Sequence, residues 1–377
     1  MDQRPEKKMK TNFKVLSVFS GAGGLDFGFY KSGFEIVFAN DIYADAVETY
    51  KLNIGTHIVC DDIKNIYNKI LKFSGNVDVI IGGPPCQGFS VAGKMDPEDK
   101  RSQMIWEYVN IIELIRPKIF IMENVKALGT LSKWGAVRNK LLVKLRRLGY
   151  STSFIVLNSS DYGVPQSRER VIFVGFYNNL SNIPDLEKIL APFKEKAKTV
   201  REVLSVLDVA GTGNNTEICK AKITLTDKPV LRKSPYAGML FNGLGRPVRI
   251  NGYCATLPAS MGGNKTPIID TDELYNNASS WVEEYHINIT NGKTIPEYKL
   301  APKRLRRLTV REAAIIQTFP LGFNFFGSQS SKYTQIGNAV PCELGYKIAQ
   351  MVSYYLENSR YKGNYPTLPF QTELTEI

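Results

Sequence analysis

Short apolar runs alternate with amphipathic stretches through the first half of the chain. The runs are apolar at consecutive positions, which is typical of strands buried on both faces of a helix-covered parallel sheet. They predict strands at residues 14–19, 35–39, 77–81, 118–122, 153–157 and 171–175. Apolar residues at helical spacing predict helices over residues 102–115 and 134–148. Alternating strands and helices predict a doubly wound, Rossmann-like α/β domain.

This regularity fades near residue 176. Residues 178–300 are rich in Asn, Gly, Pro and Thr and show no βαβ spacing. Helical patterns return at residues 309–319 and 343–356. We therefore predict four parts, which are a regular domain, a smaller irregular domain, a return to the first domain and a polar tail. Their expected bounds are residues 12–176, 177–306, 307–358 and 359–377.

The net charge of the chain says more about its function than its length does. The 377 residues carry a formal net charge of +12, and 43% of them are hydrophobic, so a packed protein with a polyanionic partner is expected. Nucleic acid is the first candidate, although a generally basic, solvated surface would give the same charge. No apolar run approaches the roughly 18 residues that span a bilayer, and residues 1–11 lack the apolar stretch of a secretory signal.

The cysteines do not form a recognisable disulfide or metal pattern. Their number is odd, no Cys-x-x-Cys pair occurs, and only two histidines could assist them. They are Cys60, Cys86, Cys219, Cys254 and Cys342. We therefore expect no metal site, a reducing cytoplasm and a mechanism that does not depend on histidine.

A glycine-rich turn directly follows the first predicted strand. Gly21, Gly23 and Gly24 permit a tight turn and close approach of a ligand to the backbone. The dinucleotide pattern needs glycine at position 26, where this chain has aspartate, and this weakens an NAD or FAD interpretation. Asp41 ends the second strand, where a ribose-binding carboxylate sits in nucleotide folds. A nucleoside-bearing cofactor without a pyrophosphate is expected, although a glycine turn is often only structural.

Chemically active side chains follow other predicted strands. Cys86 lies just after the third strand, behind two prolines that fix the direction of the chain, which favours a reactive thiol over a small buried apolar residue. Glu123 ends the fourth strand, and can be a proton donor or an ordinary helix-capping partner. Arg168 and Arg170 precede the sixth strand, and their alternation predicts that both lie on one side, to bind a phosphate or base carbonyl or to form salt bridges.

A basic run lies at the junction of the two expected regions. Residues 302–309 contain Arg304, Arg306 and Arg307. The run is either a solvated cluster or one wall of a phosphate-binding cleft, and its position favours the cleft.

These motifs, in this order, resemble the cytosine-C5 DNA methyltransferase family of prokaryotic restriction-modification type. The resemblance covers residues 14–355 and is carried by residues 19–29, 82–90, 123–125, 166–170, 307–320 and 335–341. It implies a Rossmann-like sheet that uses S-adenosylmethionine and a smaller, irregular target-recognition domain. Residues 12–176 would be the catalytic domain, residues 177–306 would recognise the target, and residues 307–358 would complete the cofactor pocket.

The resemblance implies which residues hold S-adenosylmethionine. The glycine turn would form the cofactor loop, Asp41 would bind the ribose, Asp62 and Ile63 would meet the adenine, and Asn338 and Val340 would close the methionine end. The full set is Phe19, Ser20, Gly21, Gly23, Gly24, Asp41, Ile42, Asp62, Ile63, Pro85, Met104, Asn338 and Val340. This chain departs from the family in having aspartate at position 41, where glutamate is usual, and Ile42, where an aromatic residue is common.

The resemblance also implies a mechanism. Cys86 would add to C6 of cytosine, because C5 alone is too weak a nucleophile to accept a methyl group. Glu123 would bond N3, Arg170 would hold O2, and Arg168 would contact a flanking phosphate. The base would have to swing out of the duplex. No side chain is an obvious base for the C5 proton.

DNA contacts are expected mainly from the irregular region. Its most distinctive stretch, residues 253–269, places Ser260, Asn264 and Lys265 where they could reach base edges or phosphates, or merely form a turn. Further candidates are Gln87, Ser90, Arg101, Arg304, Arg306 and Arg307. The expected partners are double-stranded DNA and a paired restriction endonuclease acting on the same site, for a monomer in a prokaryotic cytoplasm, associated with the nucleoid.

Three alternatives remain open from sequence. An RNA cytosine-C5 methyltransferase acting on transfer RNA would have the same fold, but its recognition region is typically smaller. A Rossmann oxidoreductase would need the glycine fingerprint that is broken here. A DNA-binding module with a dead methyltransferase fold would have no use for the intact set of Cys86, Glu123 and Arg170.

Overall fold

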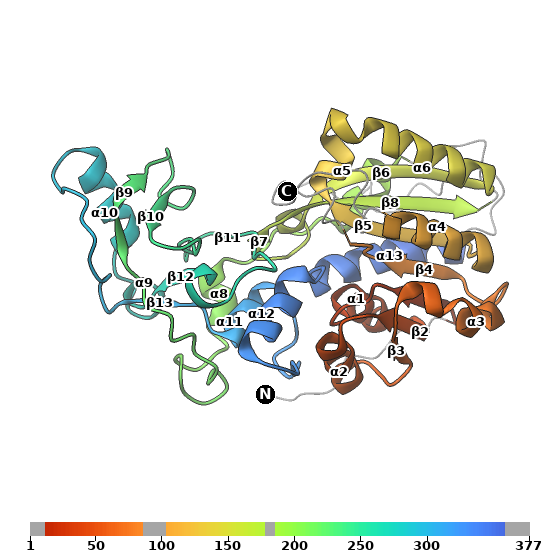
Figure 1. Cartoon of the computed structure of the whole chain (residues 1–377), viewed down its shortest axis with the longest axis horizontal. Helices are drawn as coiled ribbons and strands as arrows, with labels where there is room; N and C mark the ends of the chain where they lie inside the picture. The colour runs from red at the N-terminus through yellow and green to blue at the C-terminus, as the bar shows by residue number, and fades with distance from the viewer. Residues whose placement is uncertain (1–11, 86–102, 178–184, 359–377) are drawn as a thin grey trace, which may run out of the picture. The chain divides into compact units, whose positions relative to one another are not determined.

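The computed structural model describes residues 12–85, 103–177 and 185–358 (Figure 1). The chain divides into two compact units. The first unit comprises residues 1–162, 169–195 and 342–377, and the second comprises residues 163–168 and 196–341. The first unit is therefore assembled from three separate segments of the chain.

A seven-stranded sheet in the order β3-β2-β1-β4-β5-β8-β6 forms the centre of the first unit. The strands are β1 (Lys14–Val18), β2 (Glu35–Asp41), β3 (Ile58–Cys60), β4 (Val79–Gly82), β5 (Ile119–Val125), β6 (Tyr150–Asn158) and β8 (Glu169–Tyr177). All six predicted strands are confirmed. The sequence missed β3, which has three residues of which only Ile58 is buried.

The sheet is parallel, as the continuous apolar runs predicted, except for one strand. β1 to β5 pair in parallel, but β8 runs antiparallel to both β5 and β6. Only residues 159–168 separate β6 from β8. A parallel neighbour needs a crossover of a dozen or more residues, so this short connection reverses the chain.

Helices cover the sheet of the first unit. They are α1 (Gly24–Lys31), α2 (Ala44–Asn53), α3 (Tyr67–Ile70), α4 (Met104–Ile115), α5 (Lys126–Thr130), α6 (Gly135–Arg147), α7 (Leu186–Leu190) and α13 (Cys342–Asn358). The predicted α4, α6 and α13 are confirmed. The largest core cluster joins Ile112 of α4 and Leu141 of α6 to Ile80 and Phe120 of the sheet. Side chains on the other face of the sheet, such as Ile81, are also fully buried. The sheet is therefore covered on both faces, as the continuous apolar runs predicted.

The second unit has short strands in three two-stranded sheets. Its elements are β7 (Gln166–Ser167), α8 (Val200–Leu204), β9 (Leu225–Val230), β10 (Met239–Phe241), β11 (Cys254–Ala255), β12 (Ile268–Asp270), α9 (Thr271–Asn276), α10 (Trp281–Thr290), β13 (Leu305–Arg307), α11 (Val310–Ile316) and α12 (Gln329–Asn338). α11 is the helix predicted at residues 309–319. A small core formed by Leu225, Phe241, Val282 and Tyr285 joins β9 and β10 to α10.

The units differ from the expected domain bounds in one important place. Residues 307–341, expected to return to the first domain, cluster instead with the second unit. The cause is visible at Glu312 of α11, which pairs with Arg306 of β13 and closes a capping box with Thr309. The expected assignment of functions to the domains is a separate matter and stays a prediction.

Several chemical expectations can be compared with the described residues. Cys60, Cys219, Cys254 and Cys342 are free thiols. No group of three or more His, Cys, Asp or Glu side chains in the described ranges could hold a metal ion. None of the helices described is both long and apolar enough to cross a membrane.

Packing of α1 on α13 generates a first prediction. A Cβ at Gly28 of α1 would lie 2.3 Å from the backbone carbon of Gly345 and the backbone nitrogen of Tyr346 in α13. Gly28→Ala is therefore expected to lower the free energy of unfolding by about 2–3 kcal/mol, because the two helix backbones must separate. Urea unfolding measures this. The control Gly322→Ala adds a Cβ with nothing within 4 Å and is expected to change little; equal midpoints for the two variants would refute the packing argument.

The buried carboxyl of Asp26 on α1 generates a second prediction. Burial raises its pKa to about 7, against hydrogen bonds from Ser17 and Tyr50 that lower it. A carboxyl with a raised folded-state pKa stabilises the fold at low pH, and this contribution is lost as the pH rises through about 7.

Asp26→Asn removes the titration, so this variant is expected to lose less stability than the wild type between pH 5 and pH 8. Urea midpoints at both pH values measure the difference. Asp227→Asn, at an exposed position, is the control. Parallel pH profiles for the wild type and Asp26→Asn would contradict the assignment.

Candidate active site

An ion pair between Glu123 and Arg170 lies where β5 and β8 meet. Arg170 Nε is 3.0 Å from Glu123 Oε1, and the two side chains are only 16% and 12% exposed. The antiparallel register pairs Arg170 with Val125, two residues beyond Glu123, which places the two side chains diagonally on the same face. Arg170 also donates from Nη1 to the Glu169 carbonyl. The carboxylate is thus held in one orientation at the carboxyl end of β5.

The loop that follows β4 approaches this ion pair closely. A Cβ at Gly83 would lie 3.1 Å from Glu123 Oε2, so a glycine lets the backbone come near the carboxylate. Asn124, which is 2% exposed, donates from Nδ2 to the Pro84 carbonyl at 3.0 Å. Two consecutive residues of β5 therefore set the course of this loop. The description of the loop ends at Pro85, and the predicted Cys86, Gln87, Ser90 and Arg101 lie outside the described residues.

The glycine turn after β1 is tied to the end of β2. Gly21 N donates to Asp41 Oδ2 at 2.7 Å, and Tyr43 N donates to Asp41 Oδ1 at 2.8 Å. Phe19 and Gly23 have φ of 55° and 85°, and Gly23 is the N-cap of α1. Burial raises the pKa of the Asp41 carboxyl, although these backbone donors lower it. The structure brings together the loop and the carboxylate that the sequence predicted to act together.

The other predicted cofactor residues of the first unit lie on neighbouring elements. Ile42 is 68% exposed, directly after Asp41. Asp62 accepts a hydrogen bond from Lys64 N and caps the turn that buries Ile63. Ser20, Pro85 and Met104 are partly buried, and Gly24 is buried at the start of α1.

Two predicted cofactor residues belong to the second unit. Asn338 ends α12 and is exposed, and Val340 is buried. Their expected place in a cofactor pocket stays a prediction.

Arg168 requires a correction. Its side chain is 2% exposed and donates from Nη1 to the Leu257 carbonyl at 3.0 Å and from Nη2 to the Gly337 carbonyl at 2.9 Å. The residue lies between β7 and β8, in the second unit, whereas Arg170 belongs to the first. The expected alternation is interrupted there, and Arg168 holds segments of the second unit together instead of presenting itself to a phosphate.

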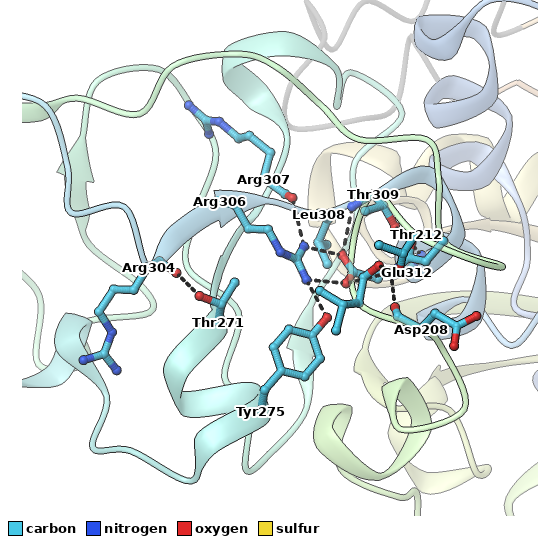
Figure 2. A network of polar contacts seen from close by, with 12 residues as sticks. Asp208, Thr212, Thr271, Tyr275, Arg304, Arg306, Arg307, Leu308, Thr309 and Glu312 are labelled. Atoms are coloured by element: carbon cyan, nitrogen blue, oxygen red, sulfur yellow. Dashed lines mark hydrogen bonds and ion pairs between the residues drawn. The ribbon is translucent and has the colours of Figure 1, made fainter.

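The three arginines predicted as a phosphate-binding wall are also committed to internal partners, and Figure 2 shows the Arg306 guanidinium bonded to Glu312 and Tyr275. Arg304 Nε bonds Asp270 Oδ1 at 2.7 Å, and the Arg306 guanidinium bonds both Glu312 oxygens at 2.6 and 2.8 Å. Arg307 is buried and donates to the carbonyls of Thr266 and Lys222. These arginines stabilise the second unit, and the expectation of a phosphate-binding wall at this run is not supported.

The predicted residues of the 253–269 stretch remain available at the surface. Ser260, Asn264 and Lys265 are exposed, and Asn264 and Lys265 lie in a short turn at Gly263–Lys265. Gly263 has φ of 52°, as a tight turn requires. Their contact with DNA stays a prediction.

Sequence reasoning gave no role to Gly83 or Asn124. Both stand inside the recognised motifs, but only the hydrogen bond to Pro84 and the approach of Gly83 to Glu123 show what they do. A signal was present in the sequence, because a glycine after one strand and an amide after its neighbour meet at one sheet edge.

The chain resembles known proteins over nearly its whole length. Residues 13–353 match the model of the family described as C-5 cytosine-specific DNA methylase. The chain is 33% identical to the Type II methyltransferase M.NgoPII of Neisseria gonorrhoeae, over 91% of this chain and 96% of that protein. It is 34% identical to M.FnuDI of Fusobacterium nucleatum, over 90% and 94%.

Solved structures show the same fold. The S. pombe Dnmt2 methyltransferase superposes with a TM-score of 0.63 at 19% identity, covering 91% of this chain and 98% of that one. The Entamoeba histolytica methyltransferase EhMeth gives a TM-score of 0.64 at 19% identity, covering 92% and 99%. With the site geometry and the family match over residues 13–353, the conclusion is that the chain belongs to the C-5 cytosine-specific DNA methylase family and is a DNA cytosine-5-methyltransferase.

Proposed function

We propose that this chain transfers a methyl group from S-adenosylmethionine to C5 of a cytosine that is flipped out of a specific duplex DNA sequence, through a covalent bond between Cys86 Sγ and C6. The observation that carries this proposal is the Glu123–Arg170 ion pair, set against Gly83 on the loop that leads to Cys86. A carboxyl and a guanidinium at one point are what binding of N3 and O2 of an activated cytosine ring needs.

The chemistry starts at the thiolate of Cys86. Its attack on C6 forms the Sγ–C6 bond and moves the ring electrons toward C5 and N3, so that C5 becomes nucleophilic. The sulfonium of the bound cofactor supplies the methyl group to C5. Loss of the C5 proton to water and departure of the thiolate then restore the aromatic ring. A stacked base cannot be attacked in this way, so the cytosine must leave the duplex.

Glu123 and Arg170 act on the opposite edge of the ring. A carboxyl bonded to N3 offsets the negative charge that develops as Cys86 attacks, and Arg170 holds O2. In the absence of a base, each of these two groups satisfies the other at 3.0 Å. When the cytosine enters, Glu123 takes up a proton from solvent and donates it in a hydrogen bond to N3, while Arg170 donates to O2. Each group thus exchanges one hydrogen bond for another.

The residues present fit a nucleoside-bearing cofactor. Each Asp41 oxygen accepts one backbone hydrogen bond and retains capacity for a ribose hydroxyl. Ile42, 68% exposed beside it, offers apolar surface to the nucleoside. The turn at Gly21 and Gly23 allows close approach of the methionine part. Asn338 and Val340 are proposed as further cofactor-binding residues.

Family and relatives favour DNA over RNA as the substrate. The family description names DNA, and the relatives above are Type II methyltransferases. We propose double-stranded DNA as the partner, with a paired restriction endonuclease at the same site, for a monomer in a prokaryotic cytoplasm. RNA methylation is the second candidate because the fold would also serve it.

Replacement of Cys86 tests the covalent step. Cys86→Ser is expected to lower methyl transfer to duplex DNA by at least about 1,000-fold while its affinity for S-adenosylmethionine is retained, because a serine hydroxyl is not ionised at neutral pH. Tritiated methyl transfer and calorimetric titration measure the two quantities. Cys60→Ser is the matched control, since Cys60 is also a free thiol.

Two outcomes would sink this proposal. Near wild-type transfer by Cys86→Ser would remove the covalent step. Labelling of transfer RNA and not of duplex DNA by the wild type would replace DNA with RNA as the substrate.

A pair of substitutions separates base activation from cofactor binding. Glu123→Gln is expected to lower the turnover number about 100- to 10,000-fold with an unchanged dissociation constant for S-adenosylmethionine. Asp41→Asn is expected to weaken cofactor binding about 10- to 100-fold, because an amide cannot accept both backbone hydrogen bonds and a ribose hydroxyl. Steady-state kinetics with varied cofactor measures both, and the reverse pattern would show that the roles are assigned wrongly.

A further inference from the structure

A hairpin in the second unit exposes three cationic side chains close together in sequence. It consists of β9, β10 and the connecting residues 231–238, and we call it the basic hairpin. Residues 225–241 include three basic residues, Lys228, Arg232 and Lys233, and one acidic residue, Asp227. All three are exposed, and none has an ion-pair or hydrogen-bond partner for its side chain among the described residues.

This arrangement contrasts with the arginines of β13 and the residue preceding that strand. Arg304 and Arg306 are neutralised by Asp270 and Glu312, and Arg307 is buried against carbonyls. A cation already paired with a carboxylate releases little free energy when it meets a phosphate, because it must first give up its partner. The basic hairpin presents its charges without that cost.

Side chains of α10 hold the backbone and one side chain of the basic hairpin in place. His286 Nε2 donates to the Arg232 carbonyl at 2.8 Å, and Tyr236 donates its hydroxyl to Glu283 Oε1 at 3.1 Å. Both His286 and Glu283 belong to α10, whose Val282 and Tyr285 pack into the small core with β9 and β10. The carbonyl that precedes Lys233 is therefore held by a largely buried imidazole.

A second set of contacts fixes residues 236–238, which lead into β10. Arg246 Nη1 donates to the Ala237 carbonyl at 2.6 Å, and the Arg249 guanidinium lies 5.1 Å from the centre of the Tyr236 ring. Gly238 closes the hairpin, because a Cβ there would lie 2.6 Å from the Val230 carbonyl oxygen. A rigid loop whose side chains face solvent is organised for a partner, since little backbone entropy is lost on binding.

Apolar side chains accompany the free cations. Val230, Leu231 and Met239 are 44%, 39% and 39% exposed on the same hairpin. A two-stranded ribbon fits the major groove of B-DNA, where thymine methyl groups offer apolar contact and guanine offers two acceptors to one guanidinium. Phosphates flank that groove on both sides, within reach of lysines. The chemistry of the basic hairpin matches this environment.

We propose that the basic hairpin enters the major groove of the target DNA, where Arg232 reads a base edge and Lys228 and Lys233 contact phosphates. This inference rests on the proposed function, and it names a sequence-determining element within it. His286 and Tyr236 are positioning residues, because they act through the backbone and ring that they hold.

The wild-type protein provides the reference. Expression in a host without cytosine methylation, followed by cytosine-conversion sequencing of the genome, gives the methylated sequence. If the wild type methylates no DNA, the proposed function fails. If it does, the variants below test the basic hairpin alone.

Arg232→Gln is expected to reduce discrimination at one base pair of the site by about 10- to 100-fold. The double variant Lys228→Gln/Lys233→Gln is expected to weaken binding to all sequences equally and to lower the slope of log affinity against log salt by about 2. Lys293→Gln, which removes an exposed lysine outside the basic hairpin, is the control and should leave both quantities unchanged.

Tyr236→Phe examines the positioning role. It keeps the ring beside Arg249 and removes the hydroxyl that donates to Glu283. We expect weaker binding of cognate DNA, unchanged binding of non-cognate DNA and an unchanged salt slope, because all cations remain.

The inference is overturned if Arg232→Gln retains the wild-type methylation pattern. It is equally overturned if the lysine double variant keeps the wild-type salt slope on duplex DNA. A loss of affinity confined to transfer RNA would assign the basic hairpin to a different nucleic acid and would also overturn it.

Discussion

The reversed direction of β8 is the constraint on which the candidate site depends. β4 and β5 run in parallel, so Gly83 and Glu123 emerge at the same edge of the sheet. β8 runs the opposite way, and the start of this strand therefore lies beside the end of β5. Arg170, at the beginning of β8, reaches Glu123 only for this reason. If β8 ran parallel to β5, Arg170 at its start would lie at the opposite edge of the sheet from Glu123.

Local hydrophobic patterns predicted most of the first unit, because strands buried on both faces leave continuous apolar runs. The direction of β8 could not be predicted in the same way, since an apolar run is the same in either direction. Only the ten residues between β6 and β8 carry that information, through the minimum length of a crossover. The loop after β4 was predicted to be functional from its residues, while the parts played by Gly83 and Asn124 came from backbone contacts that no pattern encodes.

Charge was the least reliable guide to the role of individual residues. A run of arginines at residues 304–307 resembles a phosphate-binding surface until its acidic partners are known, and Asp270 lies 34 residues away in sequence. Arg168 was predicted from strand alternation, which ends where one unit gives way to the other. Lys228, Arg232 and Lys233 drew no attention in the sequence, although all three are exposed and have no side-chain partner among the described residues. The partners of a charge, which are often remote, decide whether it faces outward for binding or serves the fold.

The packing of α13 on α1 has a consequence for how the protein is made. α1 follows the glycine turn near the start of the chain, and the helix that covers it is synthesised after the whole second unit. During translation, the buried face of α1 must wait for residues 342–358 until the 310 residues between Lys31 and Cys342 have been synthesised. A nascent chain therefore cannot complete the first unit ahead of the second. Full assembly of the first unit is a late step, completed only in chains whose second unit has already been synthesised.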